Sequence, residues 1–164
     1  MRAWLVAGAV IESPTGLLLV ANRRRDGRID WSTPGGVVDD GEAVIEGLGR
    51  EVTEETGLVV EGWVDGPLYR IEAVAPDLGW DLRVEVHRAG LVTGSLACGD
   101  DPDGIVVDAE WLAAADCRER LGTAPPWVRL PLTAWLEERW EDPRTFRYHV
   151  EGSQLGSIRV HEVG

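Results

Sequence analysis

A short acidic segment, residues 51–55, most constrains how this chain of 164 residues can fold. It reads Glu-Val-Thr-Glu-Glu, and it is preceded by a glycine-containing loop and followed by Gly57. On a helix, Glu51 and Glu55 would lie about 40° apart and Glu54 about 60° to the other side, so the three carboxylates would share one patch. Such a patch is destabilised by charge repulsion, which a hard divalent cation with oxygen ligands relieves. The segment therefore predicts a helix that holds Mg²⁺ or Mn²⁺.

These acids belong to a longer pattern, which argues against the ordinary interpretation of a solvated acidic helix face. The pattern fixes nine positions: Gly36, Glu42, Arg50, Glu51, Val52, Glu54, Glu55, Gly57 and Leu58. It resembles the signature of the Nudix hydrolase family at every defined position, and residues 31–36 resemble the usual lead-in to that signature. The resemblance is strong over about residues 3–60, weaker to about residue 120, and not evident in the last forty or so.

The resemblance implies an α/β fold, the Nudix α/β/α sandwich with a central mixed sheet. By length we expect one domain, residues 1–164, with a core of about 3–140 and a C-terminal hairpin extension of about 144–163. The hairpin is predicted from two alternating segments separated by a glycine-containing stretch. Further strands are predicted at about 4–11, 16–22, 58–65, 68–75 and 81–92, and helices at about 42–55, 113–121 and 127–140.

The predicted helix at 42–55 carries apolar residues at helical spacing, which should face the sheet: Ala43, Ile45, Leu48 and Val52. Gly57 is placed to end the helix in a left-handed conformation. Gly47 and Gly49 lie inside the helix, where each costs about 1 kcal/mol relative to Ala. Close packing of the helix on the sheet would explain both glycines.

The resemblance also implies a reaction, the metal-dependent hydrolysis of the pyrophosphate bond of a nucleoside diphosphate linked to a variable group X. The products would be a nucleoside monophosphate and phospho-X. The implied metal ligands are Glu51, Glu54, Glu55 and the main-chain carbonyl of Gly35. The predicted catalytic residues are Glu51, Glu54 and Arg50, and Gly36 and Glu42 join Arg50 in the shell that supports the carboxylates.

The identity of the general base is open between two groups of acidic residues. Some family members use a signature glutamate, which here would be Glu51 or Glu54. Others use an acid from a late loop, and the candidates here are Asp103, Asp108 and Glu110, with Asp100 and Asp101 in the same acidic stretch. For any single loop acid, a solvated side chain is the alternative.

A polar loop at residues 22–28 carries four arginines just before the signature. In the family this region faces bound phosphates, so Arg23 or Arg25 is predicted to bind substrate, and the alternative is a solvated turn. Trp31 is the best candidate for a pocket wall on which a nucleobase stacks, and Trp127 is a more distant one. Asn22 is the only asparagine, and it does not lie near the final helix, where some members read oxidised guanine with an Asn.

The composition limits the classes of molecule that the protein is expected to bind. The formal net charge of −13 opposes binding to a nucleic-acid polymer, and the expected partner is a small nucleotide. No apolar stretch approaches the ~20 residues that cross a bilayer, and we expect a cytoplasmic protein whose apolar N-terminal run is a strand. Cys98 and Cys117 have no metal-ligand spacing. A homodimer is left open.

Two functional classes compete. The first is a Nudix hydrolase, which acts on phosphorus anhydrides. The second is a catalytically inactive Nudix-fold module that binds a nucleotide or sugar nucleotide as a sensor. Inactive binders usually lose a signature carboxylate, and this chain keeps all of them, which favours the enzyme.

Overall fold

The structure is a computed structural model that describes residues 1–98 and 101–164. Its strands are β1 (Arg2–Val10), β2 (Glu12–Ser13), β3 (Gly16–Arg23), β4 (Ile29–Ser32), β5 (Gly35–Val37), β6 (Val59–Trp63), β7 (Tyr69–Ala75), β8 (Trp80–Thr93), β9 (Val106–Leu112), β10 (Arg144–Glu151) and β11 (Arg159–Val163). Its α-helices are α1 (Val44–Thr56), α2 (Ala114–Arg120) and α3 (Pro126–Glu138). Among the described residues, none of the helices combines the length and apolar character needed to cross a bilayer.

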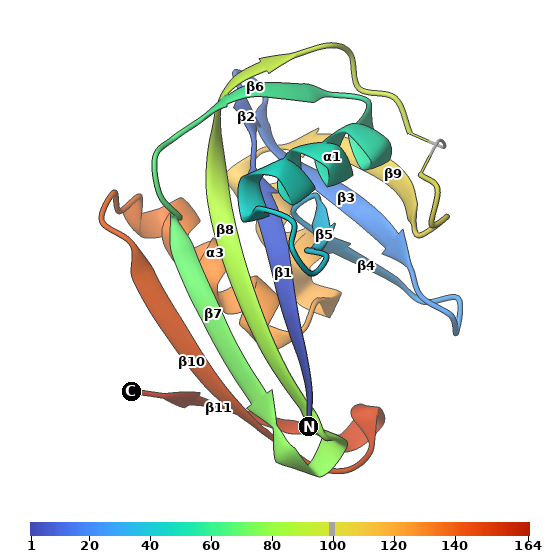
Figure 1. The fold of residues 1–164 in the computed structure, drawn as a ribbon, viewed down its shortest axis with the longest axis vertical. Coiled ribbons are helices and arrows are strands. Elements are labelled where there is room, and N and C mark those ends of the chain that lie inside the picture. Colours follow the sequence, from blue (N-terminus) through green and yellow to red (C-terminus); the bar gives the residue numbers. More distant parts are fainter. Residues whose placement is uncertain (99–100) are drawn as a thin grey trace.

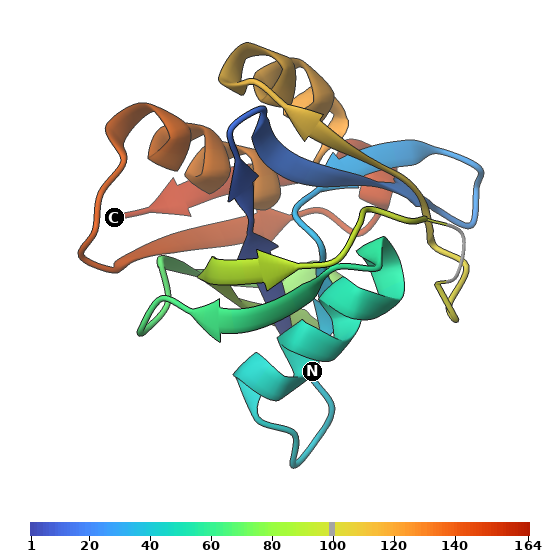
Figure 2. The ribbon, with the colours of Figure 1, turned by 90° about the horizontal axis from the view of Figure 1, so that it is seen from above.

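The strands form two sheets, and helices lie on both sides of them. The larger sheet has the order β11-β10-β7-β8-β1-β5, with β6 also paired to β8, and the smaller one joins β2, β3 and β4, with β9 on β3. The larger sheet is mixed, because β1 runs parallel to β8 and β10 runs parallel to β7. Helix α1 covers one side, and α2 and α3 lie on the other (Figures 1 and 2). The α/β/α sandwich is therefore confirmed.

Strand β3 contributes to two cores, because its successive side chains point to opposite faces. Leu19 packs in the core that contains Leu132 of α3. Leu18 packs in the core that contains Leu48 of α1. All four side chains are almost completely buried. The same alternation decides which of the polar side chains at the end of β3 face the candidate site.

Helix α1 begins at Val44, two residues later than predicted, and ends where predicted. Gly57 closes it with φ 76°, and its N–H donates to the carbonyl of Thr53. Leu48 and Val52 are completely buried, as expected. Ile45 is 37% exposed, so its predicted burial is wrong. It lies on the first turn, beside a shallow groove that is also lined by Val59, Val60 and Trp63.

The two glycines inside α1 have different surroundings, and packing on the sheet explains neither of them. A Cβ atom on Gly47 would lie 2.6 Å from Oε1 of Glu42, which precedes the helix. A Cβ atom on Gly49 would meet nothing within 4 Å. Gly47 thus leaves room for a carboxylate, whereas Gly49 only weakens the helix.

Gly49→Ala is therefore expected to raise the free energy of unfolding by about 1 kcal/mol. For a chain of this length the Tm should rise by roughly 2–4 °C, measured by circular dichroism on heating. Gly47→Ala is the matched variant, and it should gain less because the new methyl group displaces Glu42. Equal gains in both variants would contradict this explanation.

The predicted C-terminal hairpin is confirmed. Strands β10 and β11 pair antiparallel, with His149 opposite His161. The sequence did not predict that β10 also joins the larger sheet, where residues 144–149 pair with residues 69–74 of β7. Helix α3 buries Leu132, Trp135 and Leu136.

Candidate functional site

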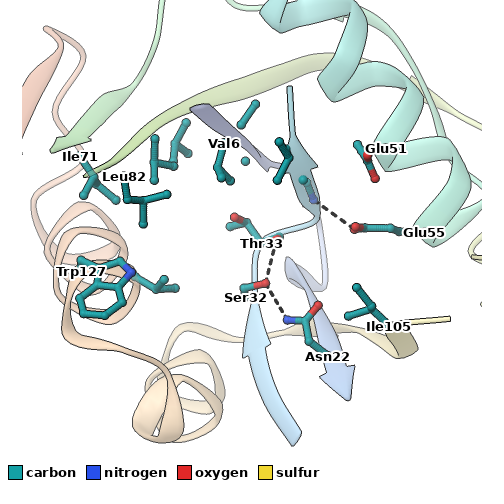
Figure 3. Close-up of a pocket in the computed structure, with 18 of the residues that line it drawn as sticks. Val6, Asn22, Ser32, Thr33, Glu51, Glu55, Ile71, Leu82, Ile105 and Trp127 are labelled. Atoms are coloured by element: carbon teal, nitrogen blue, oxygen red, sulfur yellow. Dashed lines mark hydrogen bonds between the residues drawn. The ribbon is translucent and has the colours of Figure 1, made fainter. Parts of the chain in front are cut away.

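A cavity of about 560 Å³ is bordered by α1, α3 and strands of both sheets (Figure 3). Charged residues line one end of it: Asp39, Arg50, Glu51, Glu55, Asp101 and Asp103. Polar residues line its middle, namely Asn22, Ser32 and Thr33, and Arg24 also borders the cavity. The far end is mainly apolar, with Val6, Ile71, Leu82, Val84, Trp127 and Leu132. The cavity therefore offers one ligand an acidic end, a hydrogen-bonding middle and an apolar end.

The glycine turn before α1 fits against the helix carboxylates. The N–H of Gly35 donates to Oε2 of Glu55 at 3.1 Å. A Cβ atom on Gly36 would lie 2.7 Å from the carboxyl carbon of Glu51, and one on Gly35 would collide with the carbonyl of Ala7 in β1. Both positions need glycine because β5 lies between β1 and α1 at close range.

Arg50 connects the loop before α1 to the acids on the helix. Its guanidinium lies 3.1 Å from a carboxylate oxygen of Glu42, 3.1 Å from Glu51, 3.4 Å from Glu54 and 3.7 Å from Asp39. The hydrogen bond from Arg50 lowers the pKa of Glu42. Arg50, itself paired with Glu42, thus holds the carboxylate of Glu51 in place, and the supporting role of both residues in a metal site stays a prediction.

The three signature glutamates do not all reach the cavity. Glu51 and Glu55 line it and are only 8% and 7% exposed. Glu54 lies beside the shallow groove with Ile45 and Val59, and Arg50 forms ion pairs with both Glu51 and Glu54. Over residues 1–98 and 101–164, no group of three or more His, Cys, Asp or Glu residues is placed to hold one ion. The predicted single patch is thus divided at Arg50, and the role of Glu54 as a ligand stays a prediction.

The two carboxylates in the cavity fit a divalent cation. Burial raises the pKa of Glu55 to about 8, although the hydrogen bond from Gly35 lowers it, and the charges of Glu51, Asp101 and Glu54 raise it further. Burial also raises the pKa of Glu51, and Arg50 opposes that shift. The acidic end of the cavity therefore has too little positive charge to balance its carboxylates. A bound cation would replace the protons on a donor set that suits Mg²⁺ or Mn²⁺.

The late-loop acids occupy different places. Asp101 lines the cavity, but its carboxylate accepts the N–H groups of Asp103, Ile105 and Val106 at 2.9–3.2 Å, so it shapes the loop. Asp103 also lines the cavity, and its charge contributes to the raised pKa of Glu51. Asp100 lies outside the described residues.

The other two acids proposed as the base are engaged elsewhere. The carboxylate of Asp108 accepts the N–H of Ala109 at 2.8 Å, and Asp108 pairs with Ala21 in the smaller sheet. Glu110 forms an ion pair with Arg120 of α2. Asp103 is therefore the late-loop candidate that the cavity favours.

Arg24, rather than Arg23 or Arg25, lines the cavity. Its Nε and Nη2 atoms donate to the two carboxylate oxygens of Asp30 at 2.7 and 2.8 Å. Arg23 and Arg25 are exposed and do not line the cavity, and Arg24 is itself exposed over 43% of its side chain. Asn22 and Arg23 are neighbours in β3 and point to opposite faces, whereas Arg24 follows the strand and is held by its ion pair with Asp30.

The two tryptophans named from the sequence lie in different places, Trp31 on β4 and Trp127 on α3. Trp31 pairs with Ala21 on the face opposite Asn22, and the guanidinium of Arg120 lies 4.8 Å from its ring centre. Trp127 lines the apolar end of the cavity and meets Trp80 edge to face, with ring centres 5.7 Å apart. Trp127 is thus the tryptophan that borders the cavity, and Tyr69 is a second aromatic residue in its lining.

Comparison with known proteins now decides the family. A NUDIX domain profile matches residues 3–136. The chain belongs to the NUDIX family. The NUDIX domain is 43% identical over 53 residues to "Nucleoside diphosphate-linked moiety X motif 6" of Xenopus laevis, covering 32% of this chain and 24% of that protein. It is 31% identical over 108 residues to "8-oxo-dGDP phosphatase NUDT18" of Mus musculus, covering 66% and 31% respectively. The chain therefore spans less than a third of the length of each of these two relatives.

Solved structures share the fold of this NUDIX domain. The Escherichia coli ORF135 protein superposes with a TM-score of 0.68 at 18% identity, covering 87% of this chain and 96% of that one. The MutT protein from Methanosarcina mazei Go1 gives the same TM-score at 20% identity, covering 85% and 97%. The architecture is thus shared at low sequence identity.

Two cavity residues of the NUDIX domain, Asn22 and Arg24, escaped the sequence analysis. Asn22 lies in β3 opposite Asp30, and Arg24 follows the end of β3 and forms its ion pair with the same Asp30. Asp30 lies beside both residues only because β3 pairs with β4, and no local pattern in the sequence shows that pairing.

Proposed function

We propose that this NUDIX protein hydrolyses the pyrophosphate bond of a small nucleoside di- or triphosphate derivative with Mg²⁺ or Mn²⁺. The products would be a nucleoside monophosphate and phospho-X. The observation that carries the proposal is the pair of buried carboxylates, Glu51 and Glu55, at one end of a cavity large enough for a nucleotide. The names of the two curated relatives, which refer to nucleoside diphosphates, support the same substrate class.

The residues at the acidic end have separable roles in this proposal. Glu51 and Glu55, with the carbonyl of Gly35 and with Glu54, would hold the cation. When bound, the cation supplies charge neutralisation for the phosphates and lowers the pKa of the attacking water. Arg50 keeps the carboxylate of Glu51 oriented.

Asp103 takes the proton from the attacking water in this proposal. It faces the cavity from the loop opposite α1, whereas Asp101 is committed to main-chain N–H groups of its own loop. A signature glutamate, Glu51 or Glu54, is the competing base. Mutation distinguishes the two alternatives. If Asp103 is the base, its substitution removes the basic group and no metal ligand, whereas substitution of Glu51 or Glu54 removes a ligand as well.

Asp103→Asn is expected to lower kcat by about 10²–10⁴-fold, the usual contribution of a general base, with little change in KM. Asp108→Asn is the matched control, because Asp108 lies on β9 and its carboxylate caps a neighbouring N–H. Steady-state kinetics of both variants at saturating Mg²⁺ measure the effect. Equal activity of the two variants would indicate that a signature glutamate, and not Asp103, is the general base.

A panel of nucleoside diphosphates, nucleoside triphosphates and sugar nucleotides tests the function itself. Each compound is incubated with the protein and Mg²⁺ or Mn²⁺, and the release of nucleoside monophosphate is followed by chromatography. Turnover of at least one compound, lost on chelation of the metal, is expected. Binding of a nucleotide without any turnover would support the sensor module instead.

A further inference from the structure

Asn22 is a buried amide at the middle of the cavity. Only 7% of its surface is exposed. Its side-chain nitrogen lies 2.9 Å from the hydroxyl of Ser32, 3.3 Å from Oδ1 of Asp30 and 3.4 Å from the carbonyl oxygen of Asp30. The amide is therefore held on one side by three contacts from β4.

These neighbours fix which way the amide points. The carbonyl and the ionised carboxylate of Asp30 can only accept hydrogen bonds. The hydroxyl of Ser32 donates to the carbonyl of Thr33 at 3.0 Å, so it accepts from Asn22. The NH₂ group of Asn22 must face all three, and its oxygen therefore points away from them, into the cavity (Figure 3).

Within the described part of the chain, no group donates a hydrogen bond to this oxygen. It is also not among the polar atoms that are sealed from solvent without a partner, so it borders the open cavity. A carbonyl oxygen in a largely desolvated position gains from a donor and loses when none is supplied. The cavity thus presents a fixed acceptor to its ligand.

Arg24 completes this arrangement with donors. Asp30, the residue that orients Asn22, also binds Nε and Nη2 of Arg24. Asp30 is 4% exposed, so the ion pair is supported from inside the protein. The Nε–H and one N–H of Nη2 are engaged with Asp30, so the second N–H of Nη2 and both N–H groups of Nη1 remain to donate toward a ligand. One buried carboxylate therefore orients an acceptor and a donor on the same wall.

We propose that Asn22 and Arg24 form a recognition pair that selects the substrate by its nucleoside. This inference rests on the proposed function and names the group that reads the substrate. The acidic end takes the diphosphate, and the apolar end at Trp127, Ile71 and Leu82 takes a ring. Between them, the nucleoside presents an N–H or O–H donor to Asn22 and an acceptor to Arg24. Asn22 determines specificity, and Asp30 is the positioning residue.

The donor can come from the base or from the sugar, and paired probes distinguish these sources. The probes are the non-hydrolysable α,β-methylene analogues of GDP, IDP, ADP and dGDP. GDP and IDP differ by the 2-amino group, and GDP and dGDP differ by the 2′-hydroxyl group. Isothermal titration calorimetry with Mg²⁺ gives each Kd without turnover. For the wild type, loss of the recognised donor is expected to weaken binding about ten-fold, the size of one hydrogen bond.

Asn22→Ala is expected to remove this discrimination, so that the Kd values of the sensitive pair agree within about two-fold. Asn22→Leu, which keeps the volume of the side chain, serves as the second variant in case the smaller residue unfolds the protein. Arg24→Ala is expected to weaken all the probes about ten-fold. Arg28→Ala is the control from the same loop, because Arg28 is exposed and pairs only with Asp26 among the described residues.

The outcomes separate this inference from the proposed function. If the ratio of Kd values between paired probes is the same in the folded Asn22 variants as in the wild type, the proposed recognition pair is wrong. If the discrimination depends on Asn22 but the wild type hydrolyses no compound in the panel, the recognition pair stands and the hydrolase proposal fails. If compounds are hydrolysed but the discrimination between probes does not depend on Asn22, the hydrolase proposal stands and the recognition pair fails.

Discussion

Glu51→Gln is expected to lower kcat on the order of 10³-fold at saturating Mg²⁺, while the fold is retained. Glu51 is buried at the acidic end of the cavity, and its carboxylate is held by Arg50 at 3.1 Å. The amide keeps the shape and removes the charge that would hold a cation against substrate phosphates. Steady-state kinetics across a Mg²⁺ titration measure the loss.

Glu46→Gln provides the matched control, because Glu46 is an exposed acid on the first turn of the same helix. Its kcat should stay within about two-fold of the wild type, as expected for a surface substitution away from the site. If Glu51→Gln retains wild-type kcat at any Mg²⁺ concentration, the assignment of the metal end is wrong.

Glu54→Gln tests whether Glu54 binds the same cation as Glu51 and Glu55. The sequence predicts a loss of turnover by several orders of magnitude, because Glu54 occupies a ligand position in the signature. The structure places Glu54 on the other side of Arg50. A loss as large as that of Glu51→Gln would confirm three carboxylate ligands, whereas a loss below about ten-fold would restrict Glu54 to supporting Arg50.

The second large effect is a pH-dependent stability of the metal-free protein. The pKa of Glu55 is about 8 in the folded protein and 4.5 for an ordinary glutamate. Because the folded pKa is the higher one, the stability that Glu55 contributes is complete below about pH 4.5. It is lost progressively as the pH rises from about 4.5 to about 8, above which the group is ionised in both states. We therefore expect the Tm of the metal-free protein to fall between pH 5 and 9, steeply up to about pH 7 and less so beyond it.

Each pH unit in this window costs up to about 1.4 kcal/mol for one titrating group, and each kcal/mol lowers the Tm by roughly 2–4 °C. Saturating Mg²⁺ should restore the Tm, and more so at higher pH, because a cation bound only to the folded state stabilises it by mass action. Calorimetric scans with EDTA or Mg²⁺ at several pH values measure both effects.

Glu55→Gln cannot titrate, so its metal-free Tm should vary less between pH 5 and 9, and its gain from Mg²⁺ should be smaller. A Mg²⁺ gain of wild-type size in the triple variant Glu51→Gln, Glu54→Gln, Glu55→Gln would place the ion elsewhere. A metal-free Tm that rises with pH would show that Glu55 is ionised throughout.

The sequence was sufficient wherever the site depends on local geometry. Helical spacing places Glu51 and Glu55 on the buried side of α1, and Gly57 ends the helix, because both features follow from contacts within a few residues. The match of Gly35 and Gly36 to the signature corresponds to real steric limits in the structure. The three helices and the longer strands follow from periodicity in the same way, whereas β4, β5 and β9 were not predicted.

The sequence was insufficient wherever a side chain's direction depends on pairing between distant strands. Arg23, Arg24 and Arg25 are chemically equal in the sequence, and the pairing of β3 with β4 turns only Arg24 toward Asp30 and the cavity. Trp31 is adjacent to the signature, yet the same pairing points it to the other face. The division of the carboxylates by Arg50 likewise depends on rotamers and on the loop that carries Asp39 and Glu42.

The position of β10 has a consequence for how the chain is made. Residues 144–149 pair with residues 69–74, so the outer edge of β7 stays unpaired until β10 has been synthesised and has left the ribosome. An unpaired edge can pair with the wrong chain, and parallel pairing across such a sequence distance forms slowly. Nascent chains that lack β10 should therefore need chaperone protection that the finished protein no longer needs.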